Sequence, residues 1–127
     1  MNKKFLGVHS LAGKNVSLYV EPGYGGSFTF SPDKKSIPEI IIGMSYDKWE
    51  RTIAIVLHEA MEFEMASSDC RYFRSNDFGE DHSCYQFIFD HPKFSDLCGR
   101  VGGFMSTALP VIAAEWNKRH GKKQSAK

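Results

Sequence analysis

The sequence predicts a single α+β domain, in which a small antiparallel or mixed sheet packs on a central helix and C-terminal helices follow. Alternating and β-branched runs gather in residues 5–44, an apolar helical pattern spans about 46–66, and helical spacing returns after residue 91. The 127 residues are 42% hydrophobic and 24% charged, which is typical of one globular domain covering residues 1–127.

The first third of the chain is predicted to form strands. Residues 5–11 are a short mixed run, and residues 16–20 alternate in the manner of a strand. Residues 27–30 alternate again after a Gly-rich connector, so we expect 16–20 and 27–30 to form a hairpin. The β-branched run 37–44 predicts a further strand, and Pro38 suits its start or an edge position.

A helix is predicted from about residue 46 to about residue 66, with Ser45 as its N-cap. One apolar face contains Trp49, Ile53, Val56, Leu57 and Ala60. Much of the remaining surface of this helix is apolar too, which is typical of a helix at the centre of a fold.

The second half of the chain is predicted to form short strands and then helices. Residues 71–74 and 84–89 have aromatic or β-branched composition. The segment 90–92, Asp-His-Pro, is typical of a helix start. Pro110 is expected to kink or divide the helix that follows. The basic tail from about residue 118 is expected to fray.

The charge of the chain is unevenly distributed, although the formal net charge is only +1. Residues 36–100 carry twelve acidic and six basic side chains, whereas both flanking segments are basic. An acidic centre attracts cations and repels phosphate, which disfavours a nucleic-acid partner.

The cysteines and the apolar runs bear on the compartment. Cys70, Cys84 and Cys98 are odd in number and form no Cys-x-x-Cys pair, which is typical of free thiols in a reducing compartment. The N-terminus lacks the apolar core of a signal peptide, and no apolar run approaches the roughly 20 residues of a transmembrane helix. We therefore expect a cytoplasmic protein without a membrane span.

The main candidate site lies in residues 53–63. His58 and Glu62 are four residues apart and share one face of the predicted helix, with Glu59 about 100° round from His58. Buried charges require pairing or a metal. Because zinc accepts histidine nitrogen and carboxylate oxygen, His58 and Glu62 are candidate zinc ligands. Glu59 is the candidate catalytic base, which would take a proton from water.

The segment 56–62, Val-Leu-His-Glu-Ala-Met-Glu, resembles the active helix of the zincin metalloproteases, whose signature is H-E-x-x-H. Glu62 stands where that signature has its second histidine. The resemblance implies a zinc-dependent peptidase or amidase, or a degenerate hydrolase that keeps the metal. It also implies a third ligand further along the chain, for which His82 is the first candidate and His91 the second.

Two other interpretations of the sequence stay open. Cys70, His82 and Cys84 could form a structural zinc site, and His82 could activate the Cys84 thiol as a nucleophile. Alternatively, the protein is a non-catalytic accessory or inhibitor protein that binds a protein or peptide and can form homo-oligomers. Its aromatic content of 13% supports this function, because aromatic residues are common in interface cores. His58 and Glu62 would then satisfy one another.

Overall fold

The computed structural model describes residues 2–30, 37–68, 71–73 and 85–121 of the chain. The elements in this part of the chain, in order, are β1 (Lys4–Leu11), β2 (Lys14–Glu21), β3 (Gly26–Thr29), β4 (Glu39–Gly43), α1 (Trp49–Ser67), β5 (Arg71–Phe73), β6 (Tyr85–Phe87) and α2 (His91–His120). A four-stranded sheet and two long helices make up most of the fold, which confirms the predicted α+β class.

The four-stranded sheet is mixed and has the order β1-β2-β4-β3. β1 pairs with β2 and β3 with β4 in antiparallel fashion, whereas β2 and β4 are parallel. Ala12 and Gly13, both with positive φ, form the tight turn between β1 and β2. β5 and β6 form a separate antiparallel pair.

The predicted hairpin between residues 16–20 and 27–30 is wrong, because β4 lies between these two strands. The Gly-rich connector between β2 and β3 passes beyond the end of β4 instead of making a tight turn. The backbone N–H of Gly43 donates to the Gly25 carbonyl at 2.8 Å, and that of Ser45 donates to the Gly23 carbonyl at 2.9 Å. β4 is therefore a central strand, and Pro38 directly precedes it, as predicted for a strand start.

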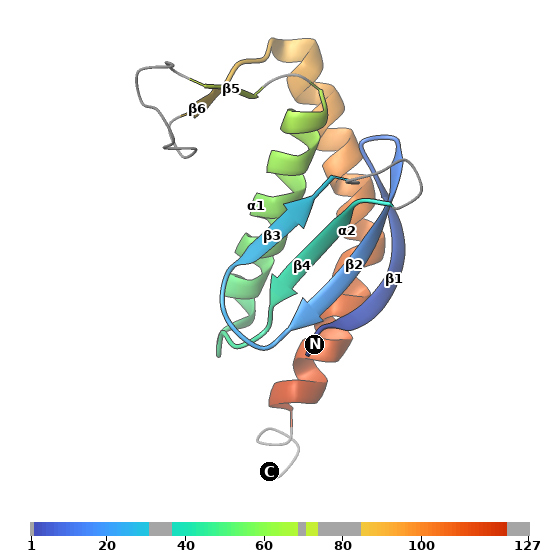
Figure 1. Ribbon diagram of the computed structural model, residues 1–127, viewed down its shortest axis with the longest axis vertical. Coiled ribbons are helices and arrows are strands. Elements are labelled where there is room, and N and C mark those ends of the chain that lie inside the picture. The colour runs from blue at the N-terminus through green and yellow to red at the C-terminus, as the bar shows by residue number, and fades with distance from the viewer. Residues whose placement is uncertain (1, 31–36, 69–70, 74–84, 122–127) are drawn as a thin grey trace.

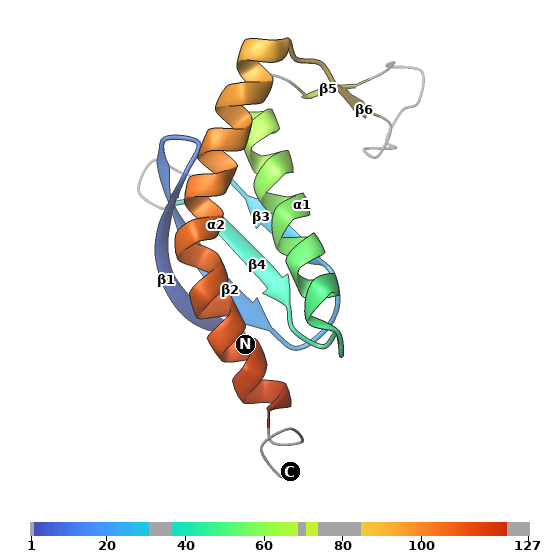
Figure 2. The same ribbon diagram turned by 180° about the vertical axis from the view of Figure 1, so that it is seen from behind.

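Both helices cover the same face of the sheet, and no helix among the described residues covers the other face (Figures 1 and 2). The core lies between these two layers. Its fully buried side chains include Val16, Leu18 and Val20 of β2, Ile40 and Ile42 of β4, Val56, Ala60 and Phe63 of α1, and Phe104, Ala108 and Ile112 of α2. Each of these strands contributes every second residue, and each helix contributes residues three or four apart.

The central helix is confirmed, but α1 begins at Trp49 rather than near residue 46. Lys48 occupies the N-cap position and provides no side-chain cap. The prediction that Ser45 is the N-cap is wrong. The Ser45 hydroxyl instead accepts a hydrogen bond from the Gly23 backbone N–H at 2.6 Å. Ser45 thus fixes the Gly-rich connector to the end of β4.

The C-terminal region forms one helix, α2, and Pro110 does not divide it. Pro110 lies on the exposed side, while Phe104, Ala108 and Ile112 are buried on the opposite side. Burial of these apolar groups stabilises the helix on both sides of the proline. At its start, the Asp90 carboxylate accepts a hydrogen bond from the Lys93 backbone N–H at 3.0 Å, which is the geometry of an N-cap.

By length and composition alone, α2 could cross a membrane, since one 18-residue window has a mean hydropathy of 1.4. This differs from the expectation that no segment would reach that length. Mostly buried core helices of soluble proteins meet the same criteria, whereas 28% of this window is buried. The buried residues of α2 belong to the hydrophobic core. The cytoplasmic location stays a prediction. So does the frayed tail, because α2 ends at His120 and residues 122–127 lie outside the described part of the chain.

Candidate metal centre

The middle of α1 brings together the three site residues that the sequence singled out. Nε2 of His58 lies 3.6 Å from Oε1 of Glu62 and 3.9 Å from Oε2 of Glu59. One potential ligand atom from each of the three residues lies within 4.8 Å of the other two. We call this group, His58, Glu59 and Glu62, the α1 cluster.

The α1 cluster combines an exposed imidazole with two shielded carboxylates. The side chain of His58 is 63% exposed, whereas those of Glu59 and Glu62 are 7% and 14% exposed. A cation could therefore reach the cluster from the imidazole side, and the carboxylates would meet it in a site of reduced water access.

The distances within the cluster resemble those between ligands of one metal ion. Two atoms bound to tetrahedral zinc at roughly 2.0–2.1 Å lie about 3.3 Å apart. A direct hydrogen bond between a ring nitrogen and a carboxylate would be about 2.7–3.2 Å long. The observed 3.6 Å and 3.9 Å exceed that range. The three atoms could therefore act as ligands of one metal ion.

Burial raises the pKa of the Glu59 carboxyl above its ordinary value of 4.5. The nearby Glu62 carboxylate raises this pKa further, and His58 opposes the shift. Desolvation penalises the charged form, and a like charge has the same effect. Glu59 is thus a better proton acceptor than an ordinary carboxylate, which suits the role of base predicted for it.

The edge strand β3 packs directly against Glu59. A Cβ atom at Gly26 would lie 2.9 Å from Cγ of Glu59 and 2.9 Å from Cγ2 of Ile55. The absence of a side chain at Gly26 lets the β3 backbone approach α1 closely. The α1 cluster consequently lies beside the point where α1 meets the edge of the sheet.

The other predicted ligands do not join the cluster among the described residues. His91 is the exposed first residue of α2 and is absent from the group that could hold a metal. His82 lies outside the described residues, so its role as third ligand stays a prediction. Cys70 and Cys84 lie outside them as well, which leaves both thiol interpretations untested. Cys98 is a free, exposed thiol on α2.

The buried carboxylate of Glu64 was missed by the sequence analysis. Glu64 is 1% exposed, and its Oε2 atom accepts hydrogen bonds from Ser68 and Arg100. The available signal was a carboxylate between Phe63 and Met65 in the apolar helical pattern. Its partner Arg100 is 36 residues away, and spacing along the chain does not reveal such a pair.

No protein-family model, curated protein or solved structure matches this chain. The described residues contain a His-Glu-x-x-Glu group whose atoms lie within metal-binding distance. The function therefore has to be argued from the geometry of the α1 cluster.

Proposed function

We propose that this protein is a small zincin-like metal-binding protein whose α1 cluster binds a divalent cation, zinc first among them. The observation that carries the proposal is the convergence of ligand atoms from His58, Glu59 and Glu62 within 4.8 Å. An imidazole and two carboxylates are good ligands for zinc. The acidic charge of residues 36–100 favours the approach of a cation.

Electrostatics within the cluster supports a bound cation. Glu59 and Glu62 are both shielded from water, and the negative charge of Glu62 raises the pKa of Glu59. A cation placed between the two carboxylates would relieve their repulsion and part of the cost of burying them.

We further propose that the protein is a metal-dependent hydrolase of the peptidase or amidase class, or a degenerate descendant of one. When bound, zinc polarises a carbonyl group and lowers the pKa of a water ligand. In this function His58 and Glu62 hold the ion, with His82 as the predicted third ligand, and Glu59 accepts a proton. In the degenerate alternative, Glu59 is itself a ligand and the site binds metal without turnover.

The test is metal analysis of the purified protein. The wild-type protein, purified without added metal, should contain or take up one zinc ion per chain by elemental analysis. His58→Ala should lose this zinc. His91→Ala, which removes an exposed histidine outside the cluster, should retain it. A wild-type protein that takes up no stoichiometric metal would refute the proposal.

The activity of the same preparations separates the two metal functions. A hydrolase should cleave peptide or amide substrates, and Glu59→Gln should remove that activity while zinc stays bound. If Glu59→Gln instead lowers zinc affinity and no cleavage occurs in the wild type, Glu59 is a ligand of a non-catalytic site.

A second candidate function, binding of a protein partner, is favoured by the helix-free face of the sheet (Figure 1). Phe5 on this face is 52% exposed, and its ring lies 5.4 Å from that of its cross-strand partner Tyr19. Ile41 pairs with Tyr19 on the next strand. The row of apolar side chains formed by Phe5, Tyr19 and Ile41 would suit binding of a second copy of the chain. Light scattering would then give a dimer that Phe5→Lys converts to a monomer.

A further inference from the structure

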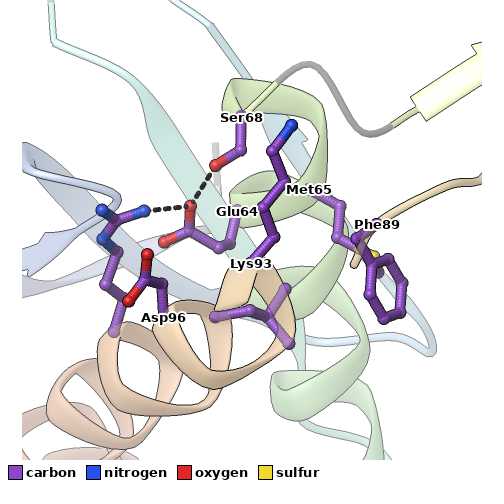
Figure 3. A pocket seen from close by; sticks show the side chains of 8 residues that line it. Glu64, Met65, Ser68, Phe89, Lys93 and Asp96 are labelled. Atoms are coloured by element: carbon purple, nitrogen blue, oxygen red, sulfur yellow. Dashed lines mark hydrogen bonds and ion pairs between the residues drawn. The ribbon is translucent and has the colours of Figure 1, made fainter. Parts of the chain in front are cut away.

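A second site lies on the opposite side of α1 from the α1 cluster. Glu64 follows Glu62 by two residues, which places it about 200° further round the helix. It lines a pocket of about 210 Å³ between the C-terminal end of α1 and the first turns of α2 (Figure 3). We call this cavity the α1–α2 pocket. Its volume is below the range of drug-sized ligands, so its ligand is a smaller molecule.

The Glu64 carboxylate, which lines this pocket, has one oxygen atom without a hydrogen-bond partner among the described residues. Oε2 accepts a hydrogen bond from the Ser68 hydroxyl at 2.7 Å and another from Nη1 of Arg100 at 3.3 Å (Figure 3). Oε1 is buried and has no hydrogen-bond partner among the described residues. A buried acceptor that lacks a donor is costly, because its hydration has been lost without replacement. A ligand with an N–H donor would remove that cost.

The charges around the pocket are balanced. Lys93 and Arg100 are basic, and Glu64 and Asp96 are acidic. Lys93 lies in the first turn of α2, whose N-terminal end is already capped by the Asp90 carboxylate. Arg100 is already bonded to Glu64, which leaves Lys93 to face an anionic group. A ligand that matches these walls carries both a positive and a negative charge.

The remaining wall of the pocket is apolar. Met65 and Leu97 are buried, and Phe89 is partly exposed. The ring of Phe89 stacks on that of Phe94, with centroids 5.9 Å apart and planes inclined by 12°. An apolar group of the ligand would be shielded from water against these side chains.

We propose that the α1–α2 pocket binds a small zwitterion of the amino-acid class with an apolar side chain. The ammonium group pairs with the Glu64 carboxylate. The carboxylate of the ligand faces Lys93. The side chain packs against Met65 and Phe89. This site uses none of the residues of the α1 cluster, so it does not depend on metal binding there.

Calorimetric titration of the full-length protein with matched probes tests the proposal. The probes are L-leucine and L-methionine, together with isoamylamine, which lacks the carboxylate of leucine, and 4-methylpentanoate, which lacks its ammonium group. At least one amino acid should bind saturably at one site. Each singly charged analogue of leucine should bind roughly tenfold more weakly or worse, because one charged contact is lost.

Variants assign the binding to this pocket. Glu64→Gln should weaken amino-acid binding by about tenfold. Lys93→Met should weaken amino-acid binding by a similar factor. Because Lys93 is exposed, this variant should fold even if Glu64→Gln does not. Lys48→Met, an exposed lysine outside this pocket, should have no effect. His58→Ala should also leave amino-acid binding unchanged, which separates this site from the metal centre.

Three results would overturn the proposal. One is the absence of saturable binding by both amino acids up to about 10 mM. Another is binding of isoamylamine or 4-methylpentanoate as tightly as leucine. The third is unchanged leucine binding in Lys93→Met.

Discussion

Nε2 of His58 lies 3.6 Å from Oε1 of Glu62, one helical turn further along α1. Two kinds of interaction can account for this proximity. An ion pair needs a protonated imidazole and weakens as salt is added, because the imidazole is exposed. A shared metal ion needs a neutral imidazole, so its affinity weakens as the pH falls. The two explanations therefore respond differently to pH and to salt.

Glu62→Gln should lower zinc affinity by about 100-fold, equivalent to about 2.8 kcal/mol, because a neutral amide replaces a charged ligand. Competition with a zinc-binding dye measures this change. Glu50→Gln is the matched control, since Glu50 is an exposed carboxylate in the first turn of α1 and lies outside the cluster. Equal affinities of the two variants would remove Glu62 from the ligand set.

Glu59 should make the metal-free protein less stable as the pH rises. Its pKa in the folded state is raised above 4.5 by burial. Its favourable contribution is therefore complete below the unfolded pKa and is lost as the pH rises through the folded pKa. Urea unfolding with a chelator present should show Glu59→Gln gaining stability over the wild type as the pH rises above 4.5 and through the folded-state pKa. The opposite trend, with the wild type gaining on the variant, would contradict the buried-carboxylate account.

Gly26→Ala should disturb the α1 cluster through β3. The added methyl group would lie 2.9 Å from Cγ of Glu59, so the carboxylate or the strand has to move. We expect a stability loss of about 1–3 kcal/mol and weaker zinc binding. Ser27→Ala, an exposed position in the same strand, should change neither quantity. Unchanged zinc affinity in Gly26→Ala would mean that Glu59 does not contribute to the site in its present position.

Gly43→Ala and Gly102→Ala should change stability in opposite directions. A Cβ at Gly43 would lie 2.7 Å from the Gly23 carbonyl oxygen and 2.8 Å from the Tyr24 carbonyl carbon. Backbone atoms cannot move aside cheaply, so we expect a loss of about 1–3 kcal/mol in unfolding free energy.

At Gly102, an exposed position within α2, a Cβ would meet nothing within 4 Å. Alanine there should stabilise the protein by about 0.5–1 kcal/mol through its higher helix propensity. Urea unfolding measures both variants. A Gly43→Ala protein as stable as the wild type would show that the connector does not pack against β4.

The sequence predicted the features that depend on local periodicity. The fold class and α1 follow from apolar residues at strand or helix spacing, and the His58–Glu62 proximity follows from the 3.6-residue turn. The β2–β3 hairpin failed because the parallel pairing of β2 with β4 is non-local, and a Gly-rich connector permits either arrangement. Pro110 did not divide α2, since packing on both sides of it outweighs the lost hydrogen bond.

The limits of sequence reasoning are equally clear at the sites. The α1–α2 pocket could not be predicted, because Glu64 and Arg100 meet only when two helices pack together. By contrast, Glu59 was assigned only the role of base, although its position beside His58 also makes it a potential ligand.

The position of β4 between β2 and β3 also dictates an order of assembly during synthesis. When the first 30 residues have left the ribosome, β1 and β2 can close their tight turn, but β3 has no strand beside it. Its neighbour in the described sheet, β4, ends at Gly43. Thr29 of β3 and the Glu39 that it pairs with are about 10 residues apart, whereas Ser17 of β2 and Glu39 are about 20 residues apart. The shorter loop costs less closure entropy, so β3 can pair with β4 before β4 joins β2. The sheet is therefore completed when the β3–β4 pair docks on the β1–β2 pair.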